Sequence, residues 1–170
     1  MKNLRLLLLP LCVLFVLTSC KKNSNTTGNT TGTITVNIDG TAQTFNVGAT
    51  AHVDNTGGFY TLSLIGVQSA SAANSIIVEV TNSSPIVAGT YTGTNSQADM
   101  SYTQVSGSAV YQFDGSNNAS NATITIKSIS STNVQGTFSG TLEIITGAGT
   151  SSKILTNGTF NLNIKAPASI

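Results

Sequence analysis

The chain is poor in charged residues. Among its 170 residues are seven Lys and Arg and six Asp and Glu, so that only 8% are charged. This fraction is about a third of that in an average soluble protein. A protein that binds nucleic acid needs a basic surface to neutralise phosphates, yet four of the seven cations lie within the first 22 residues. The composition therefore excludes an electrostatic partner such as nucleic acid.

The side chains that hold metals and attack substrates are equally scarce. There are one His, two Cys and no Trp, whereas an ordinary zinc site built from protein ligands takes three or four such residues. By contrast, Thr, Ser and Asn number 26, 21 and 17, so 64 of the 170 residues carry a small uncharged polar side chain. The composition predicts a polar, nearly uncharged protein without a metal site or cofactor.

The first 19 residues have the pattern of a lipoprotein signal peptide. Lys2 and Arg5 precede an apolar run over 6–17, which is too short to span a bilayer because a spanning helix needs about 20 apolar residues. The sequence Leu17-Thr18-Ser19-Cys20 then resembles the lipobox of bacterial lipoproteins, which implies cleavage before Cys20 and lipid on its thiol. We predict a lipid anchor at Cys20. The alternative is an ordinary cleaved signal followed by a chance cysteine.

A polar segment comes directly after the predicted anchor. Residues 21–32 contain no apolar side chain, and such a segment cannot bury enough surface to offset the entropy of ordering it. We predict that the lipidated Cys and this polar segment, residues 20–32, form a flexible tether of about 40 Å when fully extended. Lys21 and Lys22 either contact anionic lipid head groups or are simply solvated. Because Cys12 leaves with the signal, the mature chain would keep no free thiol.

The remaining residues, 33–170, predict a single β-domain. Apolar residues alternate with Thr and Asn in several segments, as at Ile34, Val36 and Ile38, and this period of two is typical of strands with one buried face. Turn sequences such as Asp39-Gly40 separate the segments. We expect nine to eleven strands, near residues 33–38, 41–47, 50–54, 59–67, 75–81, 89–93, 99–105, 109–114, 121–130, 133–145 and 153–164.

Short connections between these strands favour antiparallel neighbours. The predicted fold is therefore all-β: a meander-rich antiparallel β-sandwich or a flattened, nearly closed β-barrel. Charges usually protect the edges of a sheet, and they are scarce here, so either closure hides the edges or a partner strand covers one. Gly-Thr-aromatic triplets at 89–91, 136–138 and 158–160 are interpreted as points where a strand begins, with Gly allowing a bend before the aromatic residue.

These features resemble a group of small lipoproteins of Bacteroidetes-type bacteria that have no assigned activity. The resemblance rests on the lipobox with Lys21-Lys22 after it and on strand-and-turn patterns at 36–40, 89–91, 133–140 and 156–161. It covers most of 33–164 and implies an all-β fold and an address in the cell envelope, but no active site. Surface-exported members of such groups carry acidic residues after the Cys, where this chain has Lys-Lys-Asn, so either face of the outer membrane remains open.

Few residues offer an active site. His52 and Asp54 share one face of an expected strand, and Ser63 or Ser69 would have to complete a triad, but no Gly-x-Ser-x-Gly motif is present. A glycosidase would need two carboxylates held in a cleft, and the six carboxylates fall on different strands and turns. The run 114–118 resembles the start of a calcium loop but lacks the distal Glu, which favours a plain turn. We predict no catalytic residue and no enzyme activity.

Four aromatic residues are the candidate ligand-binding residues: Tyr91, Tyr102, Tyr111 and Phe113. If the strands at 99–105 and 109–114 pair, their rings would form a strip of the kind that sugar-binding surfaces use. The alternative is that the same rings pack in the core or across strands, and the lack of Trp favours it.

Together these features predict a non-enzymatic, lipid-anchored binding, adhesion or structural protein of the bacterial cell envelope, at the outer membrane. Its partners would be the membrane, through Cys20, and a glycan or another envelope protein, with no nucleic acid. The alternative is a lipocalin-like carrier that encloses a small apolar ligand inside a β-barrel, which rests on architecture alone. An envelope hydrolase is a third hypothesis.

Overall fold

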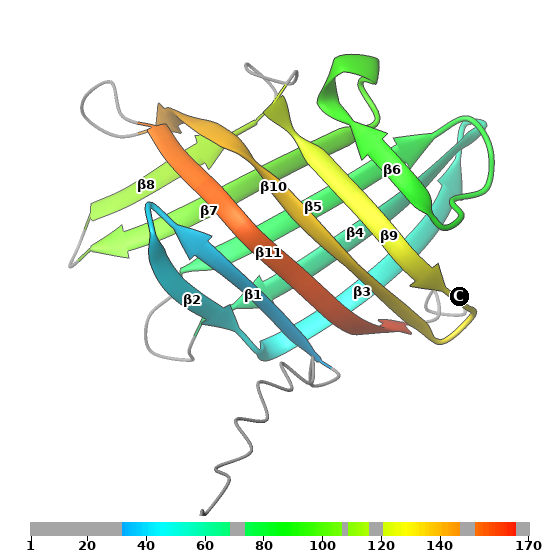
Figure 1. Ribbon diagram of the computed structural model, residues 1–170, viewed down its shortest axis with the longest axis horizontal. Coiled ribbons are helices and arrows are strands. Elements are labelled where there is room, and N and C mark those ends of the chain that lie inside the picture. Colours follow the sequence, from blue (N-terminus) through cyan, green and yellow to red (C-terminus); the bar gives the residue numbers. More distant parts are fainter. Residues whose placement is uncertain (1–31, 69–73, 107–108, 116–120, 147–151, 166–170) are drawn as a thin grey trace, which may run out of the picture.

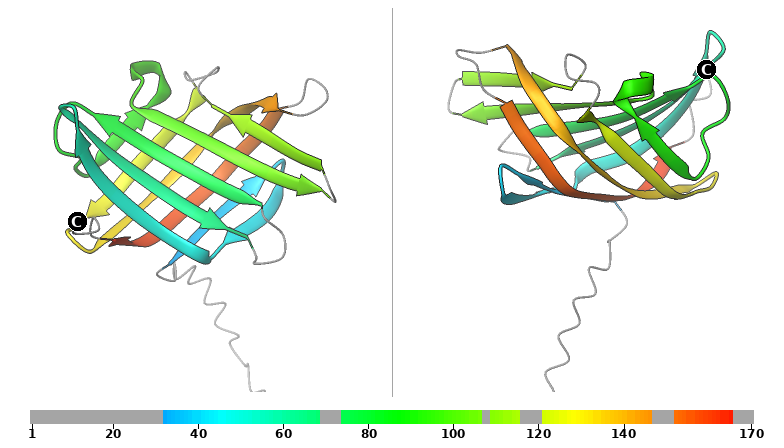
Figure 2. Two further views of the ribbon diagram at one scale, coloured as in Figure 1. Left: turned by 180° about the vertical axis from the view of Figure 1, so that it is seen from behind. Right: turned by 45° about the horizontal axis from the view of Figure 1, so that its top comes forward.

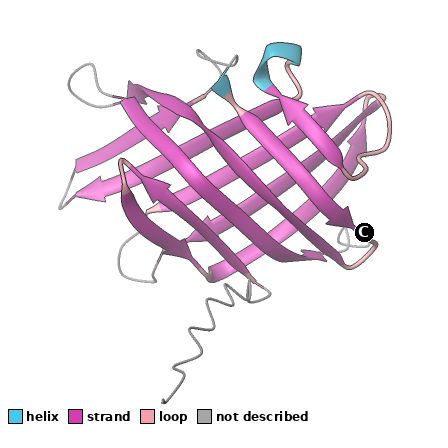
Figure 3. Cartoon of the chain, viewed as in Figure 1, coloured by secondary structure: helices cyan, strands magenta, loops and turns pink. Residues whose placement is uncertain are grey.

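The computed structural model describes residues 32–68, 74–106, 109–115, 121–146 and 152–165. Within these ranges the chain forms eleven strands and no α-helix, and its helical residues are of the 3-10 type (Figure 3). The elements are β1 (Thr33–Ile38), β2 (Thr41–Phe45), β3 (Val47–Thr56), β4 (Phe59–Val67), β5 (Ser75–Asn82), β6 (Gly89–Thr92), η1 (Gly93–Asn95), β7 (Ala98–Ser106), β8 (Ala109–Asp114), β9 (Thr123–Ile129), β10 (Asn133–Thr146) and β11 (Ser152–Lys165). The predicted all-β fold and strand number are confirmed.

The strands are arranged in two layers that cross each other (Figures 1 and 2). We call β2-β1-β11-β10-β9-β6 the first layer and β3-β4-β5-β7-β8 the second layer. The layers join where β11 pairs with β3 and where β10 pairs with β8, so all the strands belong to one continuous sheet. The result is a flattened, sandwich-like sheet that remains open at β2 and β6 within the part of the chain that the structure describes.

One pairing departs from the predicted antiparallel pattern. β11 runs parallel to β3, with Ile164 opposite Ala51 and Lys165 opposite His52, whereas the other strand pairs are antiparallel. Neighbours in sequence pair in β1–β2, β3–β4–β5, β7–β8 and β9–β10–β11, which confirms the meander-rich prediction. The parallel pair joins segments more than 100 residues apart, so no local sequence signal could predict it.

The two layers enclose one hydrophobic core. In β1, Ile34, Val36 and Ile38 are buried and the polar residues between them are only partly so, as the alternation predicts. The largest side chains with almost no exposed surface are Phe45, Phe160, Ile34, Leu62, Leu64, Ile76, Met100, Ile124, Ile126, Leu142, Leu155 and Leu162. A cavity large enough for water would leave exposed surface on its walls, so these side chains fill the space between the layers.

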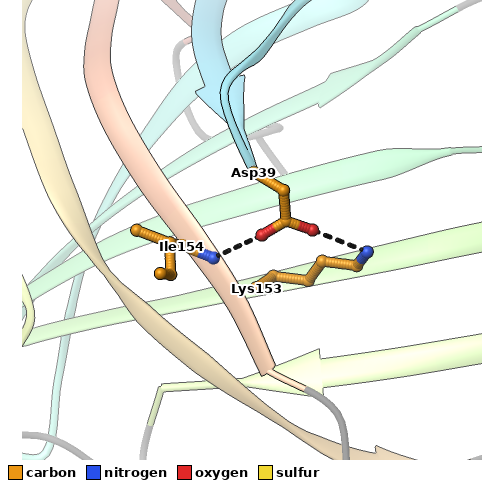
Figure 4. A network of polar contacts seen from close by, with 3 residues as sticks. All are labelled: Asp39, Lys153 and Ile154. Carbon is orange, nitrogen blue, oxygen red and sulfur yellow. Dashed lines mark hydrogen bonds and ion pairs between the residues drawn. The ribbon is translucent and has the colours of Figure 1, made fainter.

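The β1–β2 turn is fastened to β11 by Asp39. Asp39 and Gly40 have φ values of 50° and 78°, the positive values that the predicted Asp-Gly hairpin requires. The Asp39 carboxylate accepts a hydrogen bond of 2.9 Å from the Ile154 amide and lies 2.9 Å from the Lys153 ammonium (Figure 4). The Asp39 amide in turn donates to the Ile154 carbonyl. One turn residue thus joins two strands that are distant in sequence.

Two of the three Gly-Thr-aromatic triplets lie in the middle of long strands. In the β10–β11 ladder Gly136 is opposite Phe160 and Phe138 is opposite Gly158, and the two rings stack with their centroids 6.5 Å apart. Each glycine therefore leaves room for the ring on the other strand. The interpretation of these two triplets as strand starts is wrong; only Gly89 begins a strand, β6.

The predicted signal peptide, Cys20 and nearly all of the tether lie outside the described residues. In the described part, no helix has the length and apolar character needed to cross a membrane.

Candidate binding surfaces

Threonine side chains form a continuous row across the outer face of the first layer. The pairing register aligns one Thr from each of the six strands, in the order Thr44, Thr35, Thr159, Thr137, Thr125 and Thr90. Strands lie about 4.8 Å apart, so five intervals give the row a length of roughly 24 Å. We call this row the threonine ladder.

Hydroxyl groups bond to one another at two places in the ladder. The Thr35 and Thr159 hydroxyl oxygens are 2.8 Å apart, and those of Thr90 and Thr125 are 3.0 Å apart. Thr is branched at Cβ, which restricts its side-chain rotamers. The hydrogen bonds between the hydroxyls restrict these rotamers further. The ladder is therefore an ordered array of hydroxyls.

A groove of about 570 Å³ lies over β9, β10 and β11, where the ladder crosses them. It is lined by Thr123, Thr125, Thr137, Phe138, Ser139, Thr156, Asn157, Gly158 and Thr159. The Phe138 ring is buried and offers the groove little surface. The polar groups of the lining are six side-chain hydroxyls, the Asn157 amide and backbone atoms. No charged side chain lines this groove. We call it the hydroxyl groove.

A bulge in β11 shapes this groove. Between Thr159 and Thr156 β11 holds one residue more than β1, and the register against β10 shifts at the same place. Asn157, within the bulge, has a φ of 54°, a left-handed conformation that Asn tolerates better than most residues. Because a bulge bends its strand and increases the local twist, we infer that it hollows the otherwise even threonine face.

Two of the four candidate aromatic residues, Tyr91 and Tyr102, lie in the core rather than on an exposed strip. Tyr91 and Tyr102 are 6% and 4% exposed and belong to the core of different layers. Tyr91 holds the β5–β6 connection, because its hydroxyl donates to the Val87 carbonyl and accepts from the Val87 amide. Tyr102 meets Phe45 edge-to-face at 6.2 Å.

The other two candidate aromatics lie on β8. Tyr111 is half-buried against the core, and the Phe113 backbone pairs with that of Tyr102. The predicted pairing of β7 and β8 is thus confirmed. The Tyr102 side chain, however, lies on the face of this pair that is buried in the core. Burial also raises the pKa of the Tyr102 phenol, and the charge of Asp39 raises it further. Core packing therefore describes Tyr91 and Tyr102 better than ligand binding does.

The described residues of the possible triad, His52, Asp54 and Ser63, lie on the neighbouring strands β3 and β4, but Ser63 and Asp54 form hydrogen bonds with other residues. Ser63 pairs with His52 across β3 and β4, yet its hydroxyl donates to the Glu79 carboxylate at 3.1 Å. The Asp54 carboxylate accepts from the Asn55 amide and the Thr56 hydroxyl in its own turn. Both His52 and Asp54 are exposed, and Ser69 lies outside the described residues. The hydrogen bonds in this region therefore do not follow the pattern of a catalytic triad.

Three carboxylates gather on the second layer. Glu79 pairs with Asp99 across β5 and β7. Partial burial raises the pKa of Asp99, the Met100 amide that it accepts from lowers it, and the charges of Asp114 and Glu79 raise it again. These groups stand on the outer face of a sheet rather than in the cleft that a glycosidase needs. In the described part of the chain, no group of three or more His, Cys, Asp and Glu is placed to hold a metal ion, and residues 116–118 of the calcium-like run lie outside it.

Sequence reasoning missed the hydroxyl groove. The outward Thr residues were visible as the polar half of each alternating segment, but their alignment into a ladder depends on pairing between distant strands. The signal that was available is composition, since 26 Thr in 170 residues is an unusual supply of β-branched hydroxyls.

Comparison with known proteins gave no match: no family model, curated protein or solved structure is significantly similar to this chain.

Proposed function

We propose that this protein is a lipid-anchored, non-enzymatic binding module of the bacterial cell envelope, held at the outer membrane through Cys20, and that it binds a neutral glycan in the hydroxyl groove. The observation that carries the proposal is the groove itself: about 570 Å³ lined by hydroxyls from three adjacent strands without a charge. Strands hold side chains more rigidly than loops, which favours a preorganised site.

The chemistry of the groove matches an uncharged ligand with many hydroxyls. Each Thr or Ser hydroxyl donates one hydrogen bond and accepts others, so it complements a sugar hydroxyl in either direction. A charged ligand would lose its hydration here without an ionic partner in return. The ladder repeats at the strand spacing, which suits a polymer of repeating sugar units that lies across the strands.

The alternative of a lipocalin-like carrier would place its ligand elsewhere, and an apolar hollow of about 440 Å³ with Val53, Ile129 and Ile164 in its lining is the observation that favours it. A carrier needs an interior hollow, whereas Ile34, Leu62, Ile76 and Phe160 have no exposed surface between the layers. An apolar ligand would have to displace packed core side chains, which costs stability.

The test is binding of the full lipidated chain to an array of neutral glycans, in a detergent without a sugar head group. We expect at least one glycan to bind, and the triple variant Thr125→Val, Thr137→Val, Thr159→Val to bind it about 100-fold more weakly, if each hydroxyl contributes about 1 kcal/mol. Val keeps the β-branched shape and the strand propensity, so the fold should persist.

The matched control is Thr103→Val, the same exchange on β7 in the second layer. It should bind like the wild type. The proposal fails if no glycan on the array binds above background, or if the triple variant binds as tightly as the control.

A further inference from the structure

A second neutral hollow lies at another place in the fold. It measures about 230 Å³ and is lined by Phe59, Thr81, Asn82, Ser83 and the run 95–97. These residues come from the start of β4, the end of β5 and the connection between η1 and β7. The hollow contains no charged side chain, and it is smaller than the roughly 300–1,000 Å³ of sites for drug-sized ligands. Its volume suits one small ring.

An exposed aromatic ring forms one wall of this hollow. Phe59 is 55% exposed and begins β4 directly after Gly57-Gly58, whose φ values of 64° and 85° make the tight β3–β4 turn. Thr56 and Phe59 form the closing pair of this hairpin. The turn therefore holds a large apolar side chain in water beside polar groups.

Another part of the wall carries two amide side chains, those of Asn82 and Gln97. The Gln97 amide donates to the Asn82 carbonyl oxygen at 3.2 Å, and the backbones of Thr81 and Gln97 are also joined, at 3.0 Å. The first of these bonds joins the two side chains and uses the Asn82 carbonyl oxygen and one Gln97 amide proton, so that a ligand can bond to the Asn82 amide protons and the Gln97 carbonyl oxygen. Ser96, in the left-handed conformation with a φ of 54°, turns the chain at this wall.

The hollow lies away from the start of the domain. Figure 1 shows η1 and the β3–β4 hairpin toward the upper edge of the molecule and the first residues of β1 at the lower edge, and the reverse view in Figure 2 agrees. If the chain is anchored through the segment before β1, as proposed above, the anchor leaves the domain at the other end and does not cover this hollow.

We infer that this hollow binds one ring of a neutral saccharide, with the apolar face of the sugar on Phe59 and its hydroxyls on Asn82 and Gln97. An aromatic ring beside amides provides both contacts that such an amphipathic ligand needs. This ligand class accounts for an exposed phenyl ring and two amide side chains in the lining of one small hollow. The hydroxyl groove has no exposed aromatic ring in its lining, so the two sites differ in chemistry.

The test uses the absence of Trp from the sequence. In the full chain, Phe59→Trp introduces a single Trp into the wall of the hollow, and Val110→Trp places one at another exposed site, on β8, as the matched control. The probes are the methyl glycosides of glucose, galactose, mannose and N-acetylglucosamine, in a detergent without a sugar head group. We expect at least one of them to shift the emission of Phe59→Trp to the blue in a saturable way and to leave Val110→Trp unchanged.

Further variants identify the contacts. Asn82→Ala in the Phe59→Trp background should weaken the response about fivefold, the effect of losing one hydrogen bond between neutral groups. Saturation-transfer NMR with the wild type and Phe59→Ala provides a readout without Trp, in which Phe59→Ala should lose the signal of the sugar. The inference is overturned if none of the four glycosides gives either response, or if both Trp variants respond alike.

The outcome is separable from that of the hydroxyl groove. The triple Thr→Val variant, made in the Phe59→Trp background, should keep the fluorescence response because its substitutions lie on β9, β10 and β11. Loss of the response in that variant would mean that the probes bind in the groove and would contradict the second site.

Discussion

At the scale of single residues, the tightest constraints are the two glycines opposite the stacked rings. A Cβ atom at Gly136 would overlap the Thr125 carbonyl oxygen and the Phe160 ring, and one at Gly158 would lie 2.5 Å from the Phe138 carbonyl oxygen and 2.7 Å from its ring. Backbone and buried rings cannot move aside easily. We expect Gly136→Ala and Gly158→Ala each to lower the free energy of unfolding by about 1–3 kcal/mol or more, measured by urea denaturation.

Gly89 is the control for these variants, because it has the same Thr-aromatic sequence after it. A Cβ atom there meets nothing within 4 Å, and its φ is not in the left-handed region. Gly89→Ala should therefore be neutral or stabilise by about 0.4–1 kcal/mol through the unfolded state. Equal losses in all three variants would contradict the ring-pairing explanation.

Two carboxylates should give opposite dependences on pH. For Asp39, burial raises the pKa, but the Ile154 amide and then Lys153 lower it, and the net pKa is below the ordinary value of 3.8. A lowered folded pKa means stability that is present above the unfolded pKa and is lost as pH falls through the folded pKa. Asp39→Asn, which keeps the turn conformation, should cost about 1 kcal/mol at pH 7 because the pair is partly exposed, and the difference from the wild type should shrink below pH 3.8.

Asp99 is the opposite case and serves as the comparison. Its folded pKa is raised, so its ionisation opposes folding at neutral pH and the penalty disappears as pH falls below the folded pKa. Asp99→Asn retains an oxygen for the Met100 amide and should stabilise the protein at pH 7 but not at low pH. Urea denaturation at several pH values checks both; the same sign of effect in the two variants at pH 7 would contradict the assignment.

At the scale of elements, the strands differ in how many neighbours support them. β11 pairs with β1, β10 and β3, whereas among the described residues β2 pairs only with β1 and β6 only with β9. Local opening is easiest where few buried contacts are lost. We expect backbone amides of β2 and β6 to exchange with deuterium fastest and those in the middle of β10 and β11 slowest, by mass spectrometry of peptides. Uniform protection across all strands would contradict this order.

The strands were predictable because their signals are local. Alternation at Ile34, Val36 and Ile38 defines β1 without any knowledge of its partners, and Asp39-Gly40 specifies its turn. The order of the strands was not predictable, since β11 meets β3 and β1 after more than 100 intervening residues. The prediction of a flattened, nearly closed sheet agrees with the pairings, because β11 meets both β3 and β10, while β2 and β6 remain edges within the described residues.

The candidate site was predictable only in composition. Tyr102 and Phe113 were correctly placed on paired strands, but which face of the pair is buried depends on the second sheet layer, and the sequence does not show that layer. The outward Thr residues were recognised one strand at a time. Their alignment into a ladder depends on the register of five strand pairs, and register across a whole sheet is a tertiary property.

At the scale of the whole molecule, the proposed function requires a membrane anchor, and the two cysteines make this testable. Cys20→Ala should abolish metabolic labelling with radioactive palmitate and leave the protein with an uncleaved signal, because lipid attachment to that thiol precedes cleavage in the lipobox pathway. Cys12→Ala changes the same atom within the apolar run and should leave labelling intact. Labelling that survives in Cys20→Ala, or that is lost equally in both variants, would contradict an anchor at Cys20.

With the anchor established, loss of a C-terminal tag from intact cells treated with protease would place both neutral surfaces outside the cell, where they meet host or environmental glycans. Survival of the tag until the outer membrane is broken would instead direct them to glycans of the periplasm.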